Sequence, residues 1–221
     1  MVALRQPGTA ALGERFDLVL LAIKPQMWSQ SADAIARFAQ SALVPSIMAG
    51  IRTATLRAKL RTDRVVRAMP NLAAEIGDSM TVGFAAPELM SQEDRILATE
   101  LFTCIGRMEW LPSEADIDKA TAVSGSGPGY IFAITEDLID ATIAEGLAPE
   151  VADRLARQML LGSSKLLASK VKSAAALKSA VASPKGTTEA GLSVLQRDDA
   201  LSRLISQAVS AAHWRARELG D

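Results

Sequence analysis

Residues 16–25, FDLVLLAIKP, decide the fold class of the N-terminal half. The nearly continuous apolar run closes at Lys24-Pro25, which is typical of a strand buried on both faces of a parallel sheet. An amphipathic helical pattern follows over residues 26–41. Its expected inward positions are Trp28, Ile35, Phe38 and Ala39. A strand that leads directly into a helix begins a β/α rhythm, so we expect a doubly wound, Rossmann-like sheet.

The same alternation continues as far as residue 111. It predicts strands at residues 43–49, 64–69, 80–85 and 107–111, and helices at 53–60 and 91–105. After Pro112 the apolar spacing is helical throughout, with helices predicted at 114–123, 128–145, 149–169, 173–181 and 188–219. Gly146 is expected to stop the second of these helices. We therefore place an α/β domain at residues 1–112 and an all-α domain at residues 113–221.

Composition narrows the function classes. A chain of 221 residues that is 49% hydrophobic can bury a core, and long alanine-rich helices usually hide excess apolar surface in an oligomer, the alternative being a monomeric bundle. The formal net charge of -1 and the lack of like-charge blocks argue against nucleic-acid and membrane partners. Neither a signal peptide in residues 1–8 nor an apolar run of about 18 residues is found, which favours a cytoplasmic protein. Small molecules and copies of the chain are the expected partners.

Reactive side chains are scarce, since the sequence has one His, one Cys and one Tyr. Cys104 is expected to be a small buried residue, and His213 to lie on the surface near the end of the last helix. No catalytic triad and no metal site can be assembled from these residues. An enzyme of this composition must take its reactive group from a cofactor or from the substrate.

Two segments of small, donor-rich residues stand before predicted helices: residues 124–130, SGSGPGY, and residues 183–188, SPKGTT. Neither has the spacing of the G-x-G-x-x-G dinucleotide fingerprint or of a phosphate loop. One interpretation is structural: Ser126 would be the N-cap in the first segment, and Thr187 or Thr188 in the second. The other is an anion site, in which the N–H groups of Gly186, Thr187 and Thr188 would bind a carboxylate.

Four motifs together resemble pyrroline-5-carboxylate reductase in order and spacing. They are residues 20–26, LLAIKPQ, residues 67–71, RAMPN, and the two segments SGSGPGY and SPKGTT. The resemblance covers essentially the whole chain. It implies hydride transfer from NADPH or NADH to the C=N bond of 1-pyrroline-5-carboxylate, which gives L-proline. It also implies an N-terminal Rossmann domain and C-terminal helices that interleave between two subunits.

The resemblance further implies roles for individual residues. Cofactor-binding residues would be Ala22, Ile23, Lys24, Pro25, Met69, Pro70 and Asn71, with Asn71 near the nicotinamide. Gly186, Thr187 and Thr188 would hold the substrate carboxylate. The hydroxyl of Thr188 would contact the ring nitrogen, which makes Thr188 the expected catalytic residue. No metal is implied.

Three departures from the family pattern accompany the resemblance. Leu72 stands where the family has Thr after Met-Pro-Asn, and Lys185 replaces the first glycine of Ser-Pro-Gly-Gly-Thr-Thr. A positive φ at Lys185 would strain that loop. The glycine-rich fingerprint of the first βαβ unit has no counterpart, from which a truncated chain with weak nucleotide binding is expected. Two alternatives stay open: an inactive paralogue or dimerising ligand-binding module, and another imine or 2-hydroxyacid reductase.

Overall fold

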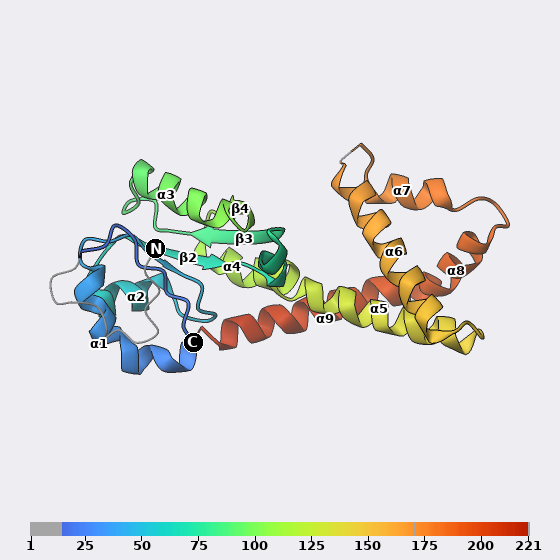
Figure 1. The fold of residues 1–221 in the computed structure, drawn as a ribbon, viewed down its shortest axis with the longest axis horizontal. Helices are drawn as coiled ribbons and strands as arrows, with labels where there is room; N and C mark the ends of the chain where they lie inside the picture. The colour runs from blue at the N-terminus through green and yellow to red at the C-terminus, as the bar shows by residue number, and fades with distance from the viewer. Residues whose placement is uncertain (1–14, 170, 221) are drawn as a thin grey trace. The chain divides into compact units, whose positions relative to one another are not determined.

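The computed structural model describes residues 15–169 and 171–220, which fall into two compact units. The first unit runs to Pro128 and also includes the C-terminal stretch from Val209. The second unit is Gly129–Ala208. Figure 1 shows strands in the first unit, whereas the second is helical.

A mixed sheet of four strands, in the order β1-β2-β3-β4, forms the centre of the described part of the first unit. The strands are β1 (Val44–Ser46), β2 (Val65–Met69), β3 (Ser79–Phe84) and β4 (Gly106–Trp110). β1 and β2 are parallel, as expected of a doubly wound sheet, but β3 is antiparallel to β2. Only the short 3-10 turn η3 (Leu72–Ile76) lies between β2 and β3, and a parallel connection needs a crossover of about a dozen or more residues. β4 runs parallel to β3. The sheet is therefore Rossmann-like, but its strands β3 and β4 run opposite to β1 and β2.

The predicted strand at residues 16–23 is present only as two isolated parallel bridges to the β1 region, Leu18 with Leu43 and Leu21 with Ser46. The Leu21 N–H donates to the Pro45 carbonyl at 2.8 Å, and the Ile47 N–H donates to the Leu21 carbonyl at 3.0 Å. Leu21 is 3% exposed, but Leu20 is 42% exposed. The segment thus lies beside β1 without being buried on both faces.

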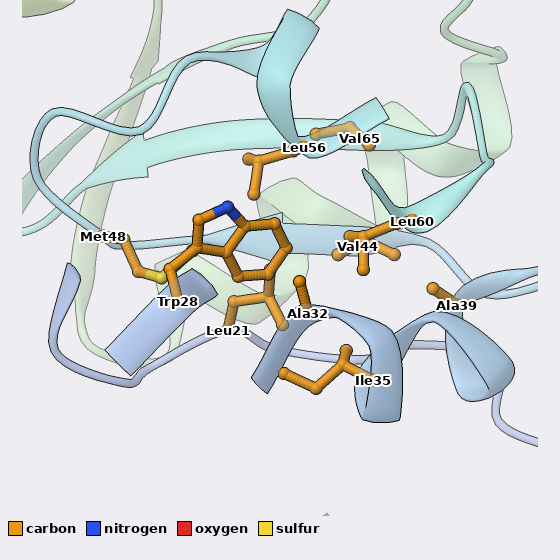
Figure 2. Packing of buried hydrophobic residues seen from close by; sticks show 10 residues of the cluster. All are labelled: Leu21, Trp28, Ala32, Ile35, Ala39, Val44, Met48, Leu56, Leu60 and Val65. Atoms are coloured by element: carbon orange, nitrogen blue, oxygen red, sulfur yellow. The ribbon is translucent and has the colours of Figure 1, made fainter. Parts of the chain in front are cut away.

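Helices cover both faces of this sheet. α1 (Trp28–Ala39) and α2 (Thr53–Leu60) lie on one face, and α3 (Gln92–Thr103) lies on the other (Figure 1). On the first face the Trp28 indole packs among Leu21, Met48 and Leu56 (Figure 2). On the second face Ala98 and Phe102 pack against Val66 and Ala68. The inward positions expected of the first helix are confirmed, since Trp28, Ile35, Phe38 and Ala39 are all buried.

The helical part begins without the predicted break at Ser124–Gly127. α4 (Glu114–Ala120) continues through a π-helical turn, η4 (Thr121–Gly125), into α5 (Gly127–Ala144). Ser126 has helical dihedral angles and its N–H donates to the Thr121 carbonyl at 2.9 Å, so the prediction that Ser126 is an N-cap was wrong. An i→i+5 bond of this kind accommodates an extra residue within a helix. The chain therefore stays helical from α4 through η4 into α5, despite its small residues and Pro128.

The remaining helices are α6 (Pro149–Ala168), α7 (Ala174–Val181), α8 (Thr187–Leu195) and α9 (Ala200–Glu218). Gly146 follows α5 with φ of 95°, which confirms it as the stop. The single helix predicted for residues 188–219 was wrong. Its break at η5 (Arg197–Asp199) has Asp198 and Asp199 at φ of 50° and 56°, a left-handed conformation that aspartate tolerates better than most residues.

The single cysteine lies at the end of α3, and the single histidine lies on α9. Cys104 is exposed, which corrects the expectation of burial: it caps the end of α3, and its thiol contacts the Glu100 carbonyl at 3.2 Å. His213 is partly buried on α9. None of the helices in the described ranges is long and apolar enough to span a bilayer. The expectation about a signal peptide concerns residues 1–8, which lie outside the described residues.

Candidate active site

Three chain segments end at the same edge of the sheet in the first unit. The segment at residues 18–21 runs parallel to β1, and β1 runs parallel to β2, so their carboxyl ends point the same way. Residues 22–25 leave the first segment, and residues 69–71 end β2. Ligands of open α/β sheets bind beyond this edge. The structure therefore brings both groups of expected cofactor residues, Ala22 to Pro25 and Met69 to Asn71, to the edge of the sheet at the carboxyl ends of these strands.

The first of these turns is open to solvent. Ala22 and Lys24 are exposed, and Ile23 and Pro25 are partly buried. The Lys24 carbonyl accepts a hydrogen bond from the Met27 N–H at 2.9 Å, and Pro25 starts the short helix η2 (Pro25–Met27). Proline suits the first helical position because that N–H would have no partner. The chain turns away at Pro25 and leaves the preceding backbone at the edge.

The second turn is organised by Asn71. Its Oδ1 accepts from the Ala73 N–H at 3.1 Å, which caps η3, and its Nδ2 donates to the Ser124 carbonyl at 3.0 Å. The Asn71 N–H donates to Ser79 Oγ at 3.1 Å. The side chain expected near the nicotinamide thus connects the end of β2 to the π-helical turn. Leu72, where the family has Thr, is 55% exposed.

A buried ionic cluster that the sequence motifs did not predict lies next to this turn. Arg67 on β2 is 2% exposed, and its Nη2 donates to Asp118 Oδ1 of α4 at 2.7 Å. Arg67 Nη1 lies 3.6 Å from Glu114 Oε1. Glu114 accepts from both the N–H and the hydroxyl of Thr53, at 2.7 and 2.8 Å, at the start of α2. An arginine within the apolar strand Val65–Met69, and carboxylates at i and i+4 on one helix, were the signals available in the sequence.

A second arginine precedes the same strand at its other end. Arg64 forms two hydrogen bonds to Asp94 of α3, at 2.6 and 3.0 Å. The hydrogen bond from Arg64 holds the pKa of the Asp94 carboxyl below its usual range, and Asp94 in turn raises the pKa of Arg64. Since this pair lies at the amino end of β2, it is remote from the candidate cofactor edge.

The expected substrate residues lie at the start of α8 in the second unit. Gly186 is the N-cap, so Thr187 and Thr188 are the first helical residues, and the interpretation of either threonine as N-cap was wrong. The first N–H groups of a helix have no partner inside it, and the positive end of the helix dipole lies there. Thr187 and Thr188 are both exposed. This helix start can therefore accept a carboxylate.

The loop before α8 is tightly folded around Lys185. Lys185 has φ of 61°, and a positive φ strains the backbone of a residue other than glycine. Its N–H donates to Glu189 Oε2 at 2.6 Å, which ties the loop to the first turn of α8. A Cβ at Gly186 would lie 2.6 Å from Ser183 Oγ and 3.0 Å from the Ser183 carbonyl oxygen. Only glycine fits at position 186 without movement of Ser183.

The expected cofactor residues thus share an edge of the first unit, and the expected substrate residues share a helix start in the second. No group of three or more His, Cys, Asp or Glu side chains that could hold a metal occurs among the residues described.

Known proteins with the same organisation are similar along nearly the whole chain. Residues 114–219 match the family model for pyrroline-5-carboxylate reductase dimerisation. A pyrroline-5-carboxylate reductase of Thermus thermophilus is 39% identical over 92% of this chain and 76% of its own length. The Pseudomonas aeruginosa enzyme of that name is 38% identical over 93% of this chain and 75% of its own.

Solved structures agree with these sequence relatives. The pyrroline-5-carboxylate reductase of Coxiella burnetii superposes with a TM-score of 0.88 at 33% identity, over 99% of this chain and 80% of its own. The Plasmodium falciparum pyrroline carboxylate reductase, crystallised with NADP bound, gives a TM-score of 0.83 at 27% identity, over 93% of this chain and 78% of its own.

Proposed function

We propose the following function for this chain, which belongs to the pyrroline-5-carboxylate reductase family: it reduces 1-pyrroline-5-carboxylate to L-proline, the last step of proline biosynthesis, with NADPH or NADH. The observation that carries the proposal is where the expected ligand-binding residues lie, at one location in each unit. One is a sheet edge suited to a dinucleotide, and the other is a helix start suited to a small carboxylate.

The residues at the sheet edge fit a nicotinamide cofactor. The backbone at Ala22 to Lys24 is accessible at the carboxyl end of a parallel segment, and the capped turn at Asn71 gives the edge a fixed second side. In this proposal Ala22, Ile23, Lys24 and Pro25 line one side, and Met69, Pro70 and Asn71 line the other. When bound, NADPH or NADH supplies the hydride.

The chain's own residues bind and orient the substrate. The N–H groups of Gly186, Thr187 and Thr188 hold the carboxylate at the positive end of α8, and the missing side chain at Gly186 lets the loop pack tightly on Ser183. The Thr188 hydroxyl contacts the ring nitrogen and holds the proton of the iminium there. A protonated cyclic imine is already electrophilic, so orientation contributes more than acid or base catalysis. The scarcity of His and Cys in the sequence is consistent with this mechanism.

The active protein is, in this proposal, a homodimer. Residues 1–112 form the dinucleotide-binding domain, and residues 113–221 form the helical dimerisation and substrate domain. The last strand, β4, ends at Trp110, and the matched dimerisation region starts at residue 114, which supports this division. Many large apolar side chains of the helices are exposed in the single chain, as a partner surface requires. In this proposal the other binding partners are small molecules, and the protein acts in the cytoplasm. It binds neither nucleic acid nor a membrane.

The purified protein tests this function directly. At a saturating nicotinamide concentration, chosen because weak nucleotide binding is expected, incubation with 1-pyrroline-5-carboxylate and NADPH or NADH should oxidise the nicotinamide. The absorbance at its characteristic wavelength should fall, and an equal amount of L-proline should form. A 2-hydroxyacid reductase would instead consume the cofactor with a 2-oxoacid. A binding module would show a thermal shift with L-proline and no turnover. Either result, in place of proline formation, would overturn the proposal.

A further inference from the structure

Pro128 has no N–H to donate to the Ser124 carbonyl, which lies four residues before it. In a regular helix this carbonyl would accept from the N–H four residues later, and proline has none. Asn71 Nδ2 donates to the Ser124 oxygen at 3.0 Å instead. The end of β2 therefore supplies a hydrogen bond that Pro128 cannot make, and the two segments are connected at this point.

The ion pair between Arg67 and Asp118 connects the same two segments a second time. Asp118 is 3% exposed and Arg67 is 2% exposed, and their atoms lie 2.7 Å apart. Arg67 precedes Met69 on β2, and Asp118 precedes η4 on α4. Two interactions, the Arg67–Asp118 ion pair and the Asn71–Ser124 hydrogen bond, therefore join the end of β2 to the segment formed by α4 and η4.

The ion pair is poorly suited to stabilise the fold alone. Arg67 Nε and Nη1 are buried and have no hydrogen-bond partner among the described residues. Burying two charges costs desolvation energy, and a well-packed apolar pair of similar size is often equally stable. The pair is nevertheless more directional than an apolar contact, because the Arg67 Nη2–H must point at the Asp118 carboxylate oxygen.

We propose that Arg67, Asp118 and Asn71 form a clamp that positions the Met69–Asn71 turn for hydride transfer. The clamp consists of the Arg67–Asp118 ion pair and the Asn71–Ser124 hydrogen bond. Arg67 and Asp118 are positioning residues: they are buried behind the turn and act on the cofactor edge through Met69 to Asn71. This inference rests on the proposed function, since the turn is the proposed nicotinamide edge.

Asp118→Asn is the primary variant, because it removes the charge at almost constant shape. The matched control is Asp94→Asn, the same chemical change at the opposite end of β2, where Arg64 is the partner. Loosening the turn should slow the chemical step by about tenfold, since small displacements of reacting atoms reduce rates strongly. KM for pyrroline-5-carboxylate should change less than twofold, and the primary isotope effect with 4-deuterated NADPH should rise. Asp94→Asn should leave kcat and the isotope effect at wild-type values.

The double variant Arg67→Met/Asp118→Leu separates positioning from stability. The double variant leaves neither Arg67 nor Asp118 as an unpaired buried charge, and Glu114 keeps its two hydrogen bonds from Thr53, so the thermal midpoint should recover relative to Asp118→Asn. The clamp is still absent, so kcat should stay low. Recovery of kcat together with the midpoint would show that the pair is only structural and would overturn the proposal.

Amide hydrogen exchange gives a readout that needs no catalysis. Asp118→Asn should speed exchange in residues 121–126 and at Ala73, whose N–H is held by Asn71. Asp94→Asn should not. Unchanged exchange in Asp118→Asn would overturn the clamp even in an active enzyme. If the wild-type protein forms no proline, the proposed reductase function fails, and the exchange result still decides whether the clamp exists.

Discussion

The two units of this chain bury their side chains differently. In the first unit, apolar side chains pack on both faces of a sheet, and buried charges are paired across elements. In the described part of the second unit, Ala152 and Ala156 are the only buried apolar residues, whereas Phe132, Leu166 and Leu204 are 57%, 60% and 63% exposed. The described part of the first unit therefore contains a packed core. The second has the surface of a protein that needs a partner, and the matched dimerisation family identifies that partner as a second copy.

The largest expected effect comes from a charge placed on the exposed apolar surface. Phe132→Asp should raise the dimer dissociation constant at least about a hundredfold, because a symmetric interface contains the new charge twice and like charges in an interface cost several kcal/mol. Sedimentation equilibrium of wild type and variant measures this. Thr135→Asp, on the same helix at an already polar position, is the control. A wild-type protein that is monomeric at micromolar concentration would contradict the contrast between the units.

Next in size is the effect of Thr188→Ala on catalysis. Loss of one hydrogen bond to the ring nitrogen should cost about 1 to 3 kcal/mol of transition-state stabilisation, or roughly ten- to a hundredfold in kcat/KM. Nucleotide affinity should be nearly unchanged, because the cofactor edge belongs to the other unit. Thr187→Ala is the matched control and should be milder, since its proposed contact is through the backbone. Steady-state kinetics that show equal losses at both positions would remove the Thr188 hydroxyl from the mechanism.

A smaller effect, opposite in sign, is expected at Lys185. Lys185→Gly should increase the free energy of unfolding by about 1 kcal/mol, because glycine adopts φ of 61° without the steric cost that other residues pay there. Lys185→Ala removes the charge but keeps the Cβ, and should give no such gain. Chemical denaturation of the three proteins measures the difference. A gain shared by the alanine variant would assign the effect to charge instead of backbone conformation.

The smallest expected effect is the acid dependence due to Asp94 in the first unit. Its pKa is lower in the folded protein than in the unfolded chain, so its ion pair stabilises the fold above the unfolded pKa and the contribution disappears as pH falls below about 4. The contribution should be about 1 kcal/mol at most, because Arg64 is 40% exposed and water screens the pair. Denaturation of wild type and Asp94→Asn between pH 7 and about pH 3 should therefore converge in acid. A difference that stays constant with pH would show that the ionised carboxylate is not the cause.

Local patterns along the chain predicted most elements of the fold. The helix at residues 53–60 is observed as α2 (Thr53–Leu60), and the strand predicted at 64–69 is observed as β2 (Val65–Met69), since each is bounded by its own local signals. Local patterns failed where distant residues decide. The glycines before Pro128 were expected to break a helix, but a π-helical turn and the Asn71 amide supply the missing bonds. Strand β3 runs antiparallel to β2 because the connection after Asn71 is too short for the crossover that a parallel strand needs.

For the candidate site, residue types and spacing left two interpretations of each glycine-containing segment, a capped turn or an anion site. The family came from the resemblance of four motifs to pyrroline-5-carboxylate reductase. Only the tertiary structure showed that Asn71 connects β2 to the π-helical turn, that Lys185 has a positive φ, and that Arg67 is paired inside the protein. The physical reason is that a side chain's partners depend on which elements pack together. From the sequence it follows that a buried arginine or asparagine needs hydrogen-bond partners, but which groups these are depends on the folded chain.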